Sequence, residues 1–141
     1  MTPDEKYADF QDWLKFMPDA IEEWKAELPE DLAKDLDFSL ASLDRLEAWL
    51  IGEFPDVDMA FGGDHISITD GAARYVGETF RRNFGGRWDM EVHDETDITY
   101  GMPHMLGFAE PGPPVVPLMV VYNAVERRTG KYFAFIADDL G

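Results

Sequence analysis

Apolar residues recur every three or four positions through the first part of the chain, as on one side of a helix. They are Phe10, Trp13, Leu14, Met17, Ile21, Trp24 and Leu28. The pattern predicts a helix over about 4–28. Pro18 lies inside this helix, but the apolar positions continue past it in phase. We therefore expect a kink or a very tight break there.

A second helix is expected over about 39–54, where Ser39 is a residue type that caps helix N-termini. Its apolar face consists of Leu40, Leu43, Leu46, Leu50, Ile51 and Phe54. Between these positions, Asp44, Glu47 and Glu53 are expected to face water.

The third predicted helix, over about 70–84, follows an expected loop at 55–68 and begins at Thr69 or Asp70. Gly77 lies in its apolar stripe, although glycine inside a helix costs ~1 kcal/mol relative to alanine. We therefore expect another segment to pack very closely against the helix at Gly77.

Short segments with alternating apolar residues predict a small antiparallel sheet over about 87–108. The first strand, at 87–92, would turn Trp88, Met90 and Val92 inward. Further short strands are expected at 98–100 and 105–108.

The last part of the chain predicts a helical segment over about 114–138, which Pro114 or Pro117 opens after a proline-rich loop at 110–114. Residues 131–139 fit a helical stripe and also have high β-propensity, and we favour a short helix. Together these elements predict one α+β domain over residues 1–141.

The net charge of −17 changes the functional picture. Residues 1–58 hold 17 acids and 5 bases, so the N-terminal helices form the acidic end. Such a chain repels nucleic acids and anionic membranes, whereas a basic protein is a favourable partner. The candidate contacts for this partner are Asp9, Asp12, Glu22, Glu23, Asp44 and Glu47. We expect a protein-binding role, without catalysis and without a cofactor.

The chain has no cysteine, which excludes disulfides and thiolate metal sites. The N-terminus lacks the apolar region of a signal peptide, and no apolar run reaches the ~18 residues of a membrane span. These features predict a cytoplasmic protein.

Arginines form a local basic stretch in the second half of the chain, at Arg74, Arg81, Arg82 and Arg87. Two roles are open for the first three, namely binding an anion or pairing with the acidic first half. We favour the pairing, because the chain needs internal counter-charges.

Two alternatives to the protein-binding role remain open. His93, Asp97 and His104 would converge if their strands pair, and could then hold a metal for a hydrolase. Without a metal, the same histidines and nearby acids are candidates for acid–base hydrolysis. In the other alternative, Trp13 and Trp24 form a dimer interface, so the chain is expected to be a monomer or a homodimer.

The sequence also resembles a family of small, uncharacterised bacterial α+β domains. In these, a helix carrying Gly-Glu, here Gly77-Glu78, ends at Gly-Gly and is followed by a strand that opens on Trp, here Trp88. The similarity covers roughly residues 37–128. Some such families occur near toxin-immunity genes, so the resemblance implies a bacterial binding domain of the immunity-protein type. It implies no catalytic residues.

Overall fold

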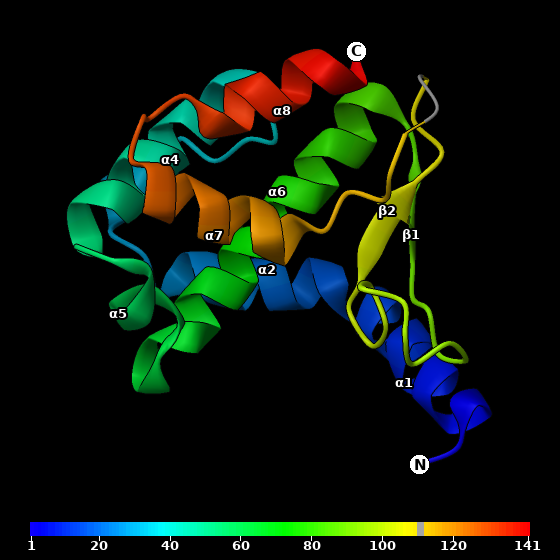
Figure 1. Cartoon of the computed structure of the whole chain (residues 1–141). Helices are drawn as coiled ribbons and strands as arrows, with labels where there is room; N and C mark the ends of the chain where they lie inside the picture. Colours follow the sequence, from blue (N-terminus) through cyan, green and yellow to red (C-terminus); the bar gives the residue numbers. More distant parts are fainter. Residues whose placement is uncertain (110–111) are drawn as a thin grey trace.

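The computed structural model describes residues 1–109 and 112–141, which are mostly helical with one small sheet (Figure 1). In chain order the elements are α1 (Pro3–Lys15), α2 (Met17–Ala26), α3 (Glu30–Ala33), α4 (Leu40–Glu53), α5 (Val57–Phe61), the 3₁₀ turn η1 (Gly63–His65), α6 (Ile66–Phe84), β1 (Arg87–Asp89), β2 (His104–Leu106), α7 (Pro117–Arg127) and α8 (Tyr132–Leu140). This is the α+β class that the sequence predicts. One hydrophobic core draws on helices from both halves of the chain.

The predicted helix over 4–28 is in fact two helices with a tight break at Phe16. Phe16 belongs to both helices, since its N–H donates to Asp12 O of α1 at 3.0 Å and its carbonyl oxygen accepts from Ala20 N of α2 at 2.9 Å. Pro18 is tolerated because it lies in the first turn of α2, where its missing N–H would have no partner. The apolar stripe faces the core as predicted.

Helix α4 begins after Ser39, whose hydroxyl oxygen accepts from Ser42 N at 3.2 Å, so the predicted cap is confirmed. Most of the predicted apolar face is buried. Leu40 is the exception, since 40% of its surface is exposed, and Ile51 is half-buried.

Residues 55–68 are not the loop that was expected, because they contain α5 and η1. Asp56 caps α5 by accepting from Met59 N at 2.9 Å. Helix α6 then begins at Ile66, so the predicted start at Thr69 or Asp70 is also wrong. The Thr69 hydroxyl donates back to Ile66 O inside the helix, instead of capping its end.

Helix α6 packs against α2, α4, α5, α7 and α8, and its middle is almost entirely buried. Two glycines let aromatic rings lie directly on its backbone. A Cβ added at Gly71 would lie 2.1 Å from Trp24 Cδ1, and one at Gly77 would lie 2.2 Å from Trp88 Cζ2. The close contact expected at Gly77 is confirmed.

The sheet is smaller than predicted. Strands β1 and β2 pair antiparallel, with Trp88 opposite Met105. Residues 98–100 do not form a strand, because Asp97 Oδ1 accepts from both the N–H and the hydroxyl of Thr99 and folds the segment into a turn. On its other side, Met105 forms an isolated antiparallel bridge with Val115.

Helix α7 begins at Pro117, one of the two predicted openings, and ends before Arg128, which has a left-handed backbone with φ of 57°. The Arg128 guanidinium bonds the last carbonyls of α4, with Nη2 2.6 Å from Ile51 O and Nη1 2.8 Å from Phe54 O. Residues 131–139 form a helix, α8, as favoured above. Of the predicted loop at 110–114, residues 110 and 111 lie outside the described residues.

Across the described residues, no helix combines the length and the apolar character needed to cross a membrane.

Candidate functional site

The six predicted partner contacts do not form one surface. Asp9 and Asp12 lie on α1, and Glu22 and Glu23 lie on α2, all of them exposed. Asp44 is also exposed, but it lies on α4, at the opposite end of the molecule from α1 (Figure 1). A partner that covers α1 therefore does not reach Asp44 by the same face.

Glu47 does not face water as predicted, because it is fully buried. Its carboxylate accepts two backbone hydrogen bonds at the start of α8, from Tyr132 N at 2.9 Å and Phe133 N at 2.8 Å. Burial raises the pKa of Glu47 more than these hydrogen bonds lower it. Glu47 is thus a structural cap between α4 and α8, and it is removed from the set of contacts.

The exposed side of α1 and α2 carries a continuous row of acids around one aromatic ring. We call Asp9, Asp12, Phe16, Asp19 and Glu23 the acidic stripe. Their spacings of three and four residues, together with the buried apolar positions that stay in phase on both sides of Phe16, place them on one side of the two helices. They lie opposite the apolar positions that enter the core.

The acidic stripe is not neutralised by ion pairs within the described part of the chain. Its four carboxylates form none, and next to it Glu22 makes a single loose pair with Lys25 at 3.8 Å. Phe16 is 55% exposed, and the Lys15 ammonium lies 5.6 Å from the centroid of its ring. The stripe therefore presents negative charge and an accessible aromatic side chain together.

The arginines of α6 were expected to form ion pairs with acids of the first half of the chain, and this expectation is wrong. Arg74 pairs with Asp70 at 3.0 Å, and Arg81 and Arg82 pair with Glu78 at 2.9 and 3.8 Å, all within α6. Burial works to raise the pKa of Glu78, but hydrogen bonds from Arg81 and Trp88 and the two arginine charges together lower it. Counter-charges for the first half are consequently few.

Arginines do reach the first half of the chain through aromatic rings. The Arg82 guanidinium lies 3.6 Å from the centroid of Phe38, and that of Arg74 lies 5.4 Å from Trp13. These cation–π contacts hold α6 against the N-terminal segments. They leave the acidic stripe uncompensated.

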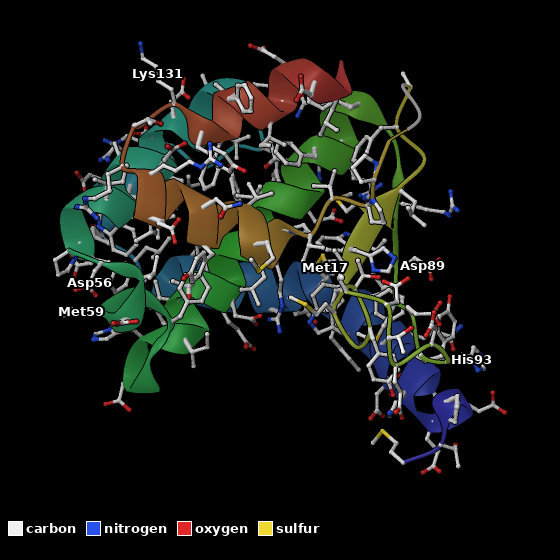
Figure 2. All side chains as sticks on the ribbon, viewed as in Figure 1. Met17, Asp56, Met59, Asp89, His93 and Lys131 are labelled. Carbon is white, nitrogen blue, oxygen red and sulfur yellow. The ribbon has the colours of Figure 1, made fainter. Side chains whose placement is uncertain are left out.

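The three residues of the predicted metal site have separate roles. His93 is exposed at the outer edge of the molecule (Figure 2), whereas His104 is buried and its Nδ1 lies 3.0 Å from Met102 O. The hydrogen bonds that Thr99 donates lower the pKa of Asp97. Among the described residues, no three histidine or acidic side chains gather closely enough to hold a metal ion.

The two tryptophans proposed for a dimer interface are used inside the fold. Trp24 is buried and donates from Nε1 to Ile68 O at 2.9 Å. Trp13 is half-buried and packs edge-on against Trp88, with ring centroids 5.1 Å apart. They do not offer the exposed stripe on which that interface depended.

A hollow of about 720 Å³ lies where β2, α7 and α8 meet, and sequence reasoning did not find it. Its walls include Met105, Val116, Met119, Val120, Ile136 and Leu140. Met119 remains 42% exposed in the wall. The apolar positions of α7 and α8 gave no signal for it, because both helices also pack against α4 and α6.

Comparisons with protein-family models, with curated proteins and with solved structures found no match for this chain. The immunity-protein-like resemblance therefore remains a prediction. The residues that carry it have structural roles here, since Trp88 packs on Gly77 and its Nε1 donates to Glu78 Oε1 at 2.9 Å.

Proposed function

We propose that the chain is a non-catalytic binding domain that engages a basic protein through its acidic stripe. One observation carries the proposal: the four exposed carboxylates of the acidic stripe form no ion pair with any described residue, and they share one side of α1 and α2 with the exposed ring of Phe16. Interfaces typically combine a desolvated aromatic anchor with a charged rim, and this combination is present on the stripe.

The charge of the stripe supports a basic partner on two physical grounds. Complementary potentials speed association and disfavour wrong partners, and both effects weaken as salt rises because the charges are exposed. The net charge of −17 disfavours nucleic acid for the same reason. The finer proposal is a neutraliser of a basic toxin, such as a nuclease, whose phosphate-binding surface the stripe would cover.

The test compares three forms of the protein as baits in extracts of the source organism. The first is the wild type, and the second carries Asp9, Asp12, Asp19 and Glu23 changed to Lys. The third is a matched control with four exposed acids elsewhere changed to Lys, namely Glu53, Asp64, Glu126 and Asp138. The melting temperature of each bait is measured first, so that a loss of binding is not a loss of fold.

The expected result is a basic protein that the wild type and the control retain and the stripe variant loses. Calorimetry with the purified partner should then give a defined stoichiometry and weaker binding at higher salt. Phe16→Ala should weaken this binding, whereas Phe135→Ala, which truncates a similarly exposed ring on α8, should not. If no protein distinguishes the stripe variant from the control at low salt, the stripe is not an interface.

A further inference from the structure

The hollow between β2, α7 and α8 has the dimensions of a small-molecule site. Its volume of about 720 Å³ falls within the ~300–1,000 Å³ typical of ligand pockets. A stable protein interface instead uses ~800 Å² on each partner, spread over a wider and flatter surface. The hollow lies on elements that do not include the acidic stripe.

The walls of the hollow are apolar and partly open to solvent. Helix α7 contributes Met119 and Val120, α8 contributes Ile136 and Leu140, and Ile98 also lines the hollow. Ile98 is 92% exposed and Met119 is 42% exposed. Apolar side chains left uncovered around a concave surface are typical of a binding site.

Asn123 and Asp139 are the polar side chains among the described lining residues, and Asp139 is the charged one. The Asn123 amide nitrogen donates to the Tyr132 hydroxyl at 3.1 Å, which leaves its carbonyl oxygen and its second N–H for a ligand. Asp139 forms no ion pair with any described residue. Arg87 lies against Gly107 at the border of the hollow but is not part of its lining. The lining side chains therefore offer a hydrogen-bond acceptor and a negative charge.

From this arrangement we propose that the hollow binds a small amphiphilic cation, with an apolar body against α7 and β2 and an amine head group at Asp139. The charge selects the occupant. An anionic amphiphile such as a fatty acid would place its carboxylate beside Asp139 in a molecule that already carries a net charge of −17. An ammonium group beside Asp139 instead meets an opposite charge, and Asn123 in the same lining adds a carbonyl acceptor.

The test uses three probes of equal chain length, decylamine, decanol and decanoate, at neutral pH and below their micellar concentrations. Titration calorimetry measures the affinity of each for the whole chain. Decylamine should bind about fivefold more tightly than decanol, as expected for one partly exposed ion pair of ~1 kcal/mol. Decanoate should bind most weakly.

Two adjacent acids on α8 provide a matched pair of variants. Asp139→Asn should remove the preference for decylamine over decanol, whereas Asp138→Asn, which makes the same change outside the lining, should preserve it. Met119→Trp should weaken binding of all three probes by filling the opening. Amide chemical shifts of the unaltered protein, recorded with decylamine, should change on β2, α7 and α8.

Several outcomes would overturn the proposal. Decanoate binding as tightly as decylamine, or an equal loss in both aspartate variants, would show that Asp139 does not select the ligand. Shift changes confined to other elements would place the probes elsewhere. If the wild type is a dimer that Met119→Trp dissociates, the hollow is occupied by a second copy. If a basic amphipathic peptide displaces decylamine and binds far more tightly, the hollow binds a protein partner instead of a small molecule. None of these outcomes bears on the acidic stripe.

Discussion

The capping of α8 by Glu47 can be tested by removing the carboxylate. In Glu47→Ala, the N–H groups of Tyr132 and Phe133 lose partners at 2.9 and 2.8 Å in a buried environment. A hydrogen bond to a charged group is worth ~1.5–3 kcal/mol. The variant also removes the free-energy cost of burying the carboxylate, and this gain offsets part of the loss of the two hydrogen bonds. We expect Glu47→Ala to lower the free energy of unfolding by about 3 kcal/mol.

Urea unfolding followed by tryptophan fluorescence measures this change, provided the unfolding slope stays constant. Asp44→Ala is the control, since it removes an exposed acid one turn earlier on α4. The control should change stability by less than ~0.5 kcal/mol. If both variants fall within that range, or if Asp44→Ala is the more damaging, the capping role of Glu47 is refuted.

The pH dependence gives a second readout of the same residue. Because burial raises the pKa of Glu47, the folded chain takes up this proton more readily than the unfolded chain. The contribution of Glu47 to stability is therefore largest below its ordinary pKa and falls as pH rises through its folded pKa. Glu47→Gln cannot titrate and puts an amide nitrogen against one N–H donor. The wild type should exceed this variant in stability by more at pH 5 than at pH 8.

Two further predictions concern backbone geometry. Gly77→Ala should destabilise the fold by about 2 kcal/mol, because its Cβ would lie 2.2 Å from Trp88 Cζ2 and overpacking outweighs the gain in helix propensity. The control Gly52→Ala should stabilise by ~0.5–1 kcal/mol in thermal unfolding, since nothing lies within 4 Å of its added Cβ. Arg128→Gly and Arg128→Ala should both destabilise the chain by freeing the α4 carbonyls, but in urea unfolding glycine should be less harmful by ~1 kcal/mol, because φ is 57°. Equal losses for these two variants would contradict a strained backbone at this position.

The periodic parts of the fold follow from the sequence because local pattern decides them. The apolar stripe of α1 and α2 and the Ser39 cap depend on residues a few positions apart, and Gly77 is anomalous within the helical pattern of α6 itself. The turn at 98–100 was not predicted, because the hydrogen bonds that Thr99 donates to the Asp97 carboxylate override the β-propensity of the segment.

The burial of Glu47 does not follow from its residue type, because glutamate is rarely fully buried. Its position does fit the apolar face, four residues after Leu43 and three before Leu50. The donors that make burial tolerable lie 85 residues further along the chain, at Tyr132. The hollow was missed for the same reason, since its walls come from elements that only tertiary packing brings together.

The packing of Trp88 against Gly77 constrains how these positions can vary among homologues. A methyl group at position 77 would collide with the indole, so any homologue that keeps the large ring has to keep the glycine as well. The same indole donates a hydrogen bond from Nε1 to the Glu78 carboxylate. Positions 77, 78 and 88 therefore depend on one another. Distant relatives should therefore change these positions together or not at all, even where their surface residues have diverged.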